Sequence, residues 1–426
     1  MRKLRGLFTS KMASAGALLM ISMTVVNAGN YVYNLIMGRW LGPALFADLS
    51  LMVTLLLVVT FLMAPIQMTT ARYSAIHTAD GDKDTLAAIR RFVWLCALWL
   101  GLTLTALFVI FAPNLQQFFH TQSAMPFVIF GAAIPFSMLQ AVERGMLQGH
   151  TNFKVLAISY QVEMWTRLLF SVGLVALGLS VNGAVTGISL SFFFTWLVVR
   201  LAVRNIAVRQ PIERSTRQSL ILFATPVLIA QLGQIMINNS DVILVKRFFE
   251  TDEAGRYAAL ALIGRIVFFA TWSVVTTMFP VVAQKQKRGE PHGHLLWLSL
   301  GIVAVVSVPI VLLTLLAPNW VVNFLFGKEY LSVAPLLWLY ALATSLYAMA
   351  NVVINYRLSL GIGRETGFAI AAGAFQIVGI LFFHQTLQQV VVVQVVVMGI
   401  LFFSLLWWNF RHTLIMAVPK MVSRDA

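Results

Sequence analysis

The sequence contains a single cysteine, Cys96, and few charged residues. One thiol excludes an intramolecular disulfide and a thiolate zinc site. Charged residues make up only 11% of the chain, against roughly 25% in an ordinary soluble domain. Hydrophobic residues make up 59% of it, and the mean hydropathy is +0.85. No soluble fold could keep so much apolar surface from water, which excludes a cytosolic enzyme, a secreted disulfide scaffold and a disordered chain.

Motifs of the common enzyme classes are also missing from the sequence. There is no Walker A motif, which excludes nucleotide hydrolysis by a P-loop, and no Gly-x-Ser-x-Gly or other nucleophile context. The 7 histidines lie in loops or near the ends of apolar runs, and only His292 and His294 are closely spaced. The sequence therefore predicts no catalytic residue, no metal site and no bound cofactor, and a protein that is not an enzyme.

Long apolar runs dominate what is present. A membrane-spanning helix needs about 20 mostly apolar residues, and a run of that length is typical of an all-α integral membrane protein. Twelve such runs are predicted to be spans, at residues 13–37, 44–71, 92–112, 125–147, 155–178, 183–203, 219–245, 256–283, 295–317, 333–356, 366–386 and 390–410.

The positions of the charges predict the orientation of these spans. Basic residues outnumber acidic ones by 30 to 15, for a formal net charge of +15. With the N-terminus in the cytoplasm, 22 of the 30 cations fall in cytoplasmic segments and 4 in outer segments. This asymmetry follows the positive-inside rule, and twelve spans then place both termini in the cytoplasm. The excess charge is explained by topology and by attraction to anionic membrane lipids, so nucleic acid is not expected as a partner.

The segments between the spans are short. The longest predicted loops lie around residues 72–91, 204–218 and 318–332, so no soluble domain is expected.

The two halves of the sequence resemble each other at a spacing of roughly 205–215 residues. An Ala-Pro-Asn motif closes the third span at 112–114 and the ninth at 317–319, and Arg39 and Arg247 follow the first and seventh spans. Because six spans are an even number, both halves enter the membrane in the same orientation, and such parallel repeats place a site between them. The alternative is two similar bundles without a central cavity. The predicted halves around this cavity are residues 1–210 and 211–426.

Two stretches of sequence carry a family resemblance. They are YNLIMGRWLGPALFADLS at 33–50 and NNSDVILVKRFFETDEAGRYAALALIGR at 238–265. With the six-plus-six layout, they resemble the oligosaccharide flippase branch of the multidrug/oligosaccharidyl-lipid/polysaccharide exporter superfamily. In that branch a helix with an aspartate, here Asp241, runs into a short outer turn, and Ala-Gly-x-Tyr, here 254–257, opens the next helix. The resemblance covers essentially the whole chain.

The resemblance implies a function. Members of this branch move undecaprenyl-pyrophosphate-linked oligosaccharide repeat units across the bacterial inner membrane by alternating access, for the synthesis of O-antigen, capsule or exopolysaccharide. The implied substrate is therefore a lipid-linked oligosaccharide, and the implied partners are other polysaccharide-assembly proteins. The motifs that carry this resemblance are specific to the superfamily and not to one substrate.

Amide side chains repeat at helical spacing in the first and seventh spans. The offset of 208 residues that aligns Arg39 with Arg247 also aligns Asn30 with Asn238. Such faces suit sugar hydroxyls, which need paired donors and acceptors; the alternative is interhelical amide bonding that only holds the bundle together. Asn30, Asn34 and Asn238 are predicted to bind substrate. The full faces comprise Asn27, Asn30 and Asn34 in the first span and Gln231, Gln234, Asn238 and Asp241 in the seventh.

Arginines within the spans predict an anion site. Guanidinium groups match phosphate oxygens in a bidentate way and remain charged when buried. Arg144, Arg167 and Arg265 are the predicted pyrophosphate ligands, with Arg39 at the outer mouth of the cavity. The alternative is a set of neutral structural ion pairs, because Glu163 and Arg167 are four residues apart on one helix. Similarly, Arg265 can pair with Asp241 if their spans are neighbours.

Carboxylates at membrane depth are candidates for carrying a coupling ion, H⁺ or Na⁺. The candidates are Asp48, Glu143, Glu163 and Asp241. A nearby arginine favours the ionised form of a carboxyl group, so Glu163 is expected to be a poor proton carrier until its pair opens. Asp241 and Glu143 are therefore the better candidates.

Two other functions compete with the flippase. A drug or organic-cation exporter of the same superfamily would need carboxylates and aromatics, whereas this membrane region has as many arginines as acids, which favours an anionic substrate. A membrane polysaccharide polymerase or ligase would be expected to use a large outer loop, and none is predicted.

Overall fold

The computed structural model describes residues 2–203, 211–360 and 366–422, and these residues are helical almost throughout. Its elements are α1 Arg2–Ala79, α2 Lys83–Ile110, α3 Ala112–Phe119, α4 Met125–Gly149, α5 Phe153–Leu174, the π-helical η1 Val175–Leu179, α6 Ser180–Ala202, α7 Arg214–Phe248, α8 Thr251–Gly264, α9 Ile266–Lys287, α10 Gly293–Leu316, α11 Pro318–Leu325, the 3-10 helix η2 Lys328–Leu336, α12 Leu337–Ser359, α13 Thr366–Phe382 and α14 Leu387–Val422.

Many of these helices are long and apolar enough to cross a membrane. Within the described residues there are 8 such segments, and α13 supplies a further, shorter apolar helix at Gly367–Phe382. The chain is therefore an all-helical, multi-pass membrane protein, as its composition predicts. The 8 segments are Leu18–Ala79, Lys83–Ile110, Met125–Gly149, Phe153–Ala202, Arg214–Phe248, Gly293–Leu316, Lys328–Ser359 and Leu387–Asn409.

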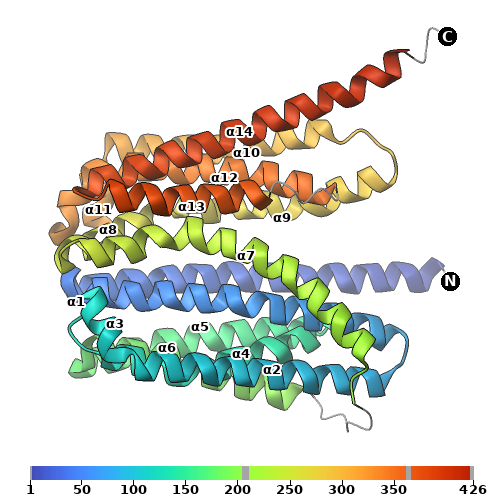
Figure 1. Cartoon of the computed structure of the whole chain (residues 1–426), viewed down its shortest axis with the longest axis horizontal. Helices are drawn as coiled ribbons and strands as arrows, with labels where there is room; N and C mark the ends of the chain where they lie inside the picture. Colours follow the sequence, from blue (N-terminus) through green and yellow to red (C-terminus); the bar gives the residue numbers. More distant parts are fainter. Residues whose placement is uncertain (1, 204–210, 361–365, 423–426) are drawn as a thin grey trace. The chain divides into compact units, whose positions relative to one another are not determined.

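Two of the segments contain a reversal at a glycine. Gly42 has φ 70° and ψ 172° within α1, and Figure 1 shows the two arms of α1 side by side. Gly178 has φ 88° between α5 and α6, which pack along each other. Glycine adopts a positive φ readily because it lacks the Cβ atom that would clash with the backbone there. The arms of these two segments correspond to four predicted spans, 13–37, 44–71, 155–178 and 183–203.

The connections are more helical than predicted. The predicted loop at 72–91 is a turn of residues 80–82, because α1 continues to Ala79 and α2 begins at Lys83. Backbone hydrogen bonds do not require apolar side chains, so a helix can run past the end of an apolar stretch. The predicted outer loop at 318–332 is likewise occupied by α11 and the start of η2.

Two other predictions about the connections fall at the edge of the described chain. Residues 204–210 of the predicted loop at 204–218 lie outside the described residues. The predicted boundary between the halves, after residue 210, lies at the end of the same segment and stays a prediction.

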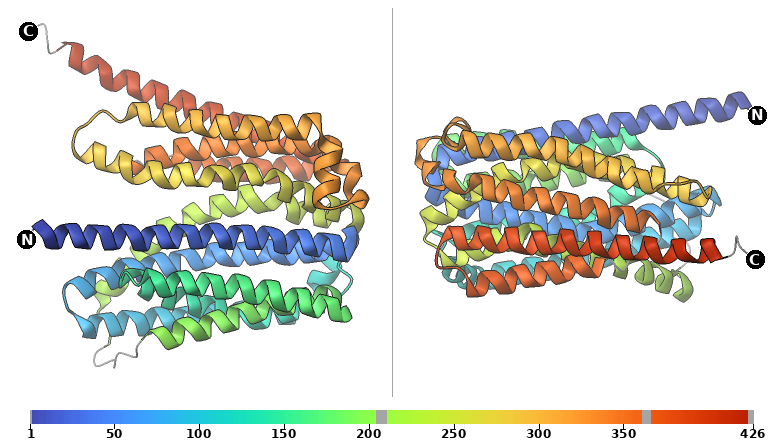
Figure 2. Two further views of the ribbon diagram at one scale, coloured as in Figure 1. Left: turned by 180° about the vertical axis from the view of Figure 1, so that it is seen from behind. Right: turned by 90° about the horizontal axis from the view of Figure 1, so that it is seen from above.

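The chain forms two compact units, Met1–Gln231 and Leu232–Ala426, which divide within α7. In the first unit, α4 is central and packs against α1, α2 and α6. Figure 2 shows the helices of this unit, coloured blue to green, running alongside one another. Small residues permit this close approach: a Cβ atom at Gly145 would lie 2.7 Å from the carbonyl oxygen of Gln67 on α1. The polar side chains of α4 are consequently buried between helices.

In the second unit, α12 is central and packs against α8, α9, α10 and α14. Val352 and Val353 are fully buried in its core. A Cβ atom at Gly264 would lie 2.2 Å from the ring of Tyr340, so the end of α8 approaches α12 closely. This packing carries the polar residues of α12 into the interior of the unit.

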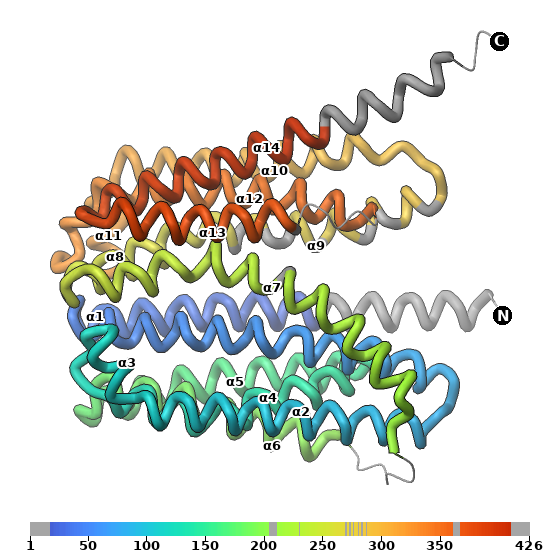
Figure 3. The backbone as a smooth tube through the Cα atoms, viewed as in Figure 1, coloured from blue at the N-terminus to red at the C-terminus, as the bar shows by residue number. Residues whose placement is uncertain are grey.

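Short helices follow a long apolar helix in each unit: α3 follows α2, and α11 follows α10 (Figure 3). In the first unit, the backbone N–H of Gln122, just after α3, donates to Oδ2 of Asp48 at 2.9 Å. Asp48 is buried and lies in α1, shortly after the reversal at Gly42. This bond ties the turn after α3 to the second arm of α1.

Candidate functional site

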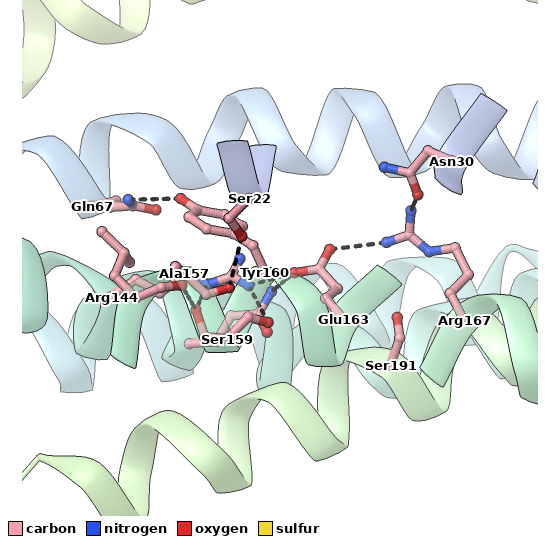
Figure 4. Close-up of polar contacts among 12 residues, drawn as sticks. Ser22, Asn30, Gln67, Arg144, Ala157, Ser159, Tyr160, Glu163, Arg167 and Ser191 are labelled. Carbon is pink, nitrogen blue, oxygen red and sulfur yellow. Dashed lines mark hydrogen bonds and ion pairs between the residues drawn. The ribbon is translucent and has the colours of Figure 1, made fainter. Parts of the chain in front are cut away.

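A half-buried carboxylate in the first unit, that of Glu163, is shared by two arginines. Glu163 on α5 contacts Nη2 of Arg144 on α4 at 2.8 Å and Nη2 of Arg167 on α5 at 2.9 Å. Figure 4 shows the three side chains converging between the helices. The Glu163–Arg167 pair predicted from the four-residue spacing is confirmed. Two guanidinium charges against one carboxylate leave this cluster with one excess positive charge.

Arg144 is held on several sides. Its Nε donates to the hydroxyl of Ser159 at 3.0 Å and its Nη2 to the Ser159 carbonyl oxygen at 3.1 Å. The guanidinium lies over the ring of Tyr160, 4.0 Å from the ring centroid, a cation–π geometry. The residue is 3% exposed. Its neighbours thus fix Arg144 in place independently of Glu163.

Arg167 is held by fewer contacts. Its Nη1 donates to Oδ1 of Asn30 on α1 at 3.0 Å, in addition to the contact with Glu163. Its Nε is buried and has no hydrogen-bond partner among the residues that the structure describes. The predicted site residues Asn30 and Arg167 are therefore brought together, and Arg167 retains an unused donor.

Further polar residues extend this cluster along the helices. Gln67 on α1 donates through Nε2 to the Tyr160 hydroxyl at 3.2 Å (Figure 4). The same Nε2 donates to Oε1 of Gln148 on α4 at 3.1 Å. Gln140 on α4 approaches Oε2 of Glu163 with its Nε2 at 3.5 Å. The polar groups thus form a connected path from α1 through α4 to α5.

A second ion pair of this unit includes a residue that the sequence reasoning misplaced. Arg90 on α2 donates to both oxygens of Glu143, at 3.1 Å from Nε and 2.7 Å from Nη2. Arg90 falls within the predicted loop at 72–91, whereas the structure places it in a helix, because α2 already begins at Lys83. The signal was present: Asp82 accepts the backbone N–H of Thr85, and an aspartate before an apolar run is a typical helix N-cap.

The second unit has its own buried carboxylate. Asp241 on α7 accepts from Nη2 of Arg265 at 3.1 Å, from the Tyr257 hydroxyl at 3.1 Å and from the Tyr340 hydroxyl at 2.7 Å. Gln394 on α14 donates to the same Tyr257 hydroxyl. The predicted pairing of Arg265 with Asp241 is confirmed. This arginine and this carboxylate balance each other's charge.

Arg265 lies at a break within a predicted span. The span predicted at 256–283 is divided into α8 and α9, and Arg265 stands between them. The Thr344 hydroxyl on α12 donates to the carbonyl oxygen of Gly264 at 2.9 Å, which supplies a partner for the backbone at the break. A small pocket adjoins the break. Its lining consists of Ile237, Asn238, Arg265, Phe268, Tyr340, Ala343, Thr344, Tyr347, Gln376, Gln394 and Met398.

Two asparagines of the predicted polar faces, Asn34 and Asn238, bond to their own helices. Asn34 donates to the carbonyl oxygen of Asn30 at 2.8 Å, and Asn238 donates to that of Gln234 at 2.9 Å. Asn238 also lines the pocket of the second unit, whereas Arg39 is exposed. The two asparagines therefore make matching local contacts in the two units.

The structure changes the ranking of the predicted coupling carboxylates. The sequence favours Asp241 and Glu143 over Glu163 because Glu163 lies four residues from an arginine, but Asp241 and Glu143 each contact an arginine at hydrogen-bond distance as well. Asp48 accepts a backbone N–H at a turn. Within the described part of the chain, no three His, Cys, Asp or Glu side chains lie close enough to share a metal ion.

The fold is similar to the folds of solved transporters of the multidrug/oligosaccharidyl-lipid/polysaccharide (MOP) exporter superfamily. The structure matches an inward-facing multidrug resistance MATE family transporter of that superfamily, covering 94% of this chain and 99% of the other with a TM-score of 0.77 and 15% identity. It matches an outward-facing MATE transporter over 93% and 95%, with a TM-score of 0.63 and 17% identity. The lipid II flippase MurJ, in an inward closed conformation, matches over 93% and 87%, with a TM-score of 0.73 and 13% identity.

The sequence identifies the family within this superfamily. The profile of the polysaccharide biosynthesis protein family matches residues 36–335, and the chain belongs to that family. The resemblance read from the sequence is thereby confirmed. A comparison of the sequence with curated proteins gives no match.

Proposed function

We propose that this protein flips undecaprenyl-pyrophosphate-linked oligosaccharide repeat units across the bacterial inner membrane for the synthesis of surface polysaccharide. The observation that carries the proposal is the sharing of Glu163 by Arg144 and Arg167. Their excess positive charge, buried at membrane depth, suits a phosphate-bearing substrate. Membership of the polysaccharide biosynthesis protein family supports an oligosaccharide as the group that the lipid carries.

The proposal includes the transport architecture. Twelve spans form two six-helix halves in parallel orientation around a central cavity, with both termini in the cytoplasm, and the halves alternate the access of the cavity. The reversals at Gly42 and Gly178 support this count, because each divides one long helical segment into two arms. A H⁺ or Na⁺ ion drives the cycle through one of the buried carboxylates.

Export of drugs or organic cations is the second candidate, and the likeness to MATE transporters favours it. A cationic substrate needs uncompensated carboxylates, whereas Glu143, Glu163 and Asp241 each contact an arginine. The charge of the first unit thus favours the anionic substrate. A polysaccharide polymerase or ligase is the least favoured, because α11 and η2 fill the longest predicted outer loop.

Surface polysaccharide export in cells lacking the gene tests the proposal. Arg144→Ala and Arg167→Ala are expected to abolish export and to leave the lipid-linked repeat unit accumulating in the inner membrane. Arg217→Ala is the matched control, because Arg217 is exposed and lies outside the cluster. Full export by both cluster variants, or restored resistance to organic cations without export, would contradict the proposal.

A further inference from the structure

We propose that Glu163 is a displaceable counter-ion: it holds the position on Arg167 that a phosphate oxygen of the substrate takes over, while Arg144 keeps Glu163 within the cluster. This inference rests on the proposed function and assigns different roles to residues that the sequence treats alike. Arg167 is the phosphate ligand, and Arg144 is a positioning residue.

The contacts of the two arginines differ in the way this exchange requires. Arg144 has its Nε and Nη2 engaged by Ser159 and its guanidinium stacked on Tyr160, so it is fixed without Glu163. Arg167 is held by Asn30 and Glu163. Releasing Glu163 from Arg167 therefore breaks one ion pair and leaves the Arg144–Glu163 contact in place.

Arg167 also has donors to offer an incoming anion. Its Nε lies buried without a partner among the described residues, at a residue that is 7% exposed. A buried, unused N–H costs free energy unless a ligand accepts from it. On the guanidinium, Nε and the Nη2 that now contacts Glu163 form a fork that a phosphate can bind in a bidentate way.

Competition by Glu163 gives the cycle a means of release. A phosphate that displaced no anion would gain the full attraction of both arginines and would leave slowly. Because Glu163 remains tied to Arg144, it stays close enough to return to Arg167 when the phosphate departs. Neutralising Glu163 should therefore strengthen binding and slow transport, which is the opposite of the usual effect of damaging a site.

Binding of farnesyl pyrophosphate to the purified full-length protein, with farnesol as the uncharged control ligand, tests this exchange. Glu163→Gln is expected to bind farnesyl pyrophosphate about tenfold more tightly than the wild type, since about 1.4 kcal/mol of competition is removed, and to export polysaccharide more slowly in cells. Arg167→Ala is expected to lose binding by tenfold or more. Glu163→Asp, which retains the charge, should bind less tightly than Glu163→Gln.

The matched control is Glu213→Gln, which removes the same charge at an exposed position outside the spans; its affinity should equal that of the wild type. Thermal unfolding of each variant shows that it is folded. If the wild type binds and Glu163→Gln binds equally or more weakly, the exchange is wrong while the proposed function stands. If neither the wild type nor Glu163→Gln binds farnesyl pyrophosphate in preference to farnesol, the proposed function falls and the exchange falls with it.

Discussion

At the scale of single residues, the buried charges of this protein have different numbers of partners. Glu143 accepts from two nitrogens of Arg90, Asp241 accepts from an arginine and two tyrosines, and Glu163 contacts two arginines. Asp241 and Arg265 balance each other's charge. At Glu163, two arginines share one carboxylate, so positive charge exceeds negative charge. We therefore expect the Glu143 and Asp241 pairs to hold helices together and the Glu163 cluster to face substrate.

The Arg90–Glu143 pair provides a stability prediction. Glu143 is 0% exposed, so Arg90→Ala leaves a buried carboxylate without its partner and should destabilise the protein by about 3–5 kcal/mol. The double variant Arg90→Met with Glu143→Leu removes both charges and should recover most of the lost stability. Thermal unfolding of the purified variants measures both effects. A double variant less stable than Arg90→Ala would contradict this interpretation.

The sequence predicts some of these contacts and not others. Glu163 and Arg167 are four residues apart on one helix, so their pairing follows from helical geometry. Arg90 and Glu143 are 53 residues apart, and their meeting depends on how α2 packs on α4, which no local pattern encodes. The contact of Ser159 with Arg144 also depends on how two helices pack, here α4 and α5. A single serine gives no local signal either, because isolated serines are common in membrane helices.

At the scale of elements, continuous apolar runs predict most of the helices. The structure places the reversals between helical arms at Gly42 and Gly178. Hydropathy finds where a helix can cross a membrane but not where it stops, which is why α1 and α2 extend beyond their predicted spans. The division of the eighth predicted span at Arg265 depends on a side chain from another helix, Thr344. The apolar pattern of α8 and α9 gives no sign of this break.

The reversal within α1 provides a prediction at this scale. Gly42 has φ 70° and ψ 172°, a conformation that is essentially restricted to glycine. Gly42→Ala should therefore destabilise the protein by about 1–3 kcal/mol. Gly301→Ala is the matched control, because Gly301 lies within α10 with nothing within 4 Å of its added Cβ atom. Equal melting temperatures of Gly42→Ala and the wild type would contradict the claim that this conformation strains an alanine.

At the scale of the whole molecule, the distribution of charge predicts the orientation in the membrane. With native Cys96 replaced by alanine, Leu115→Cys in α3 and Asn319→Cys in α11 should react with a membrane-impermeant maleimide in intact cells. Asp80→Cys, in the turn between α1 and α2, should react only after the membrane is opened. Labelling of Asp80→Cys in intact cells would reverse the proposed topology, and residue 210, also predicted to be cytoplasmic, should behave as residue 80 does.

The net charge of +15 that marks this sequence thus has two sources. We expect most of it to orient the helices in the membrane. A small part is buried within them, where charged side chains are costly and mark candidate functional sites. The similarity of the fold to both MATE transporters and MurJ does not distinguish a cationic substrate from a lipid-linked one. The sign of the buried charge in the first unit favours the lipid-linked anion.

The central claim is that this chain moves a pyrophosphate-linked oligosaccharide lipid across a bilayer. The most direct test reconstitutes the purified protein in liposomes that contain undecaprenyl-pyrophosphate-linked oligosaccharide, and a membrane-impermeant glycosidase outside reports the glycan in the outer leaflet. The wild type and Arg217→Ala are expected to move the lipid from the inner to the outer leaflet, where the glycosidase cleaves its glycan. The double variant Arg144→Ala with Arg167→Ala is expected not to move it. Equal rates of cleavage in protein-free liposomes, in liposomes with the wild type and in liposomes with the double variant would contradict this transport activity.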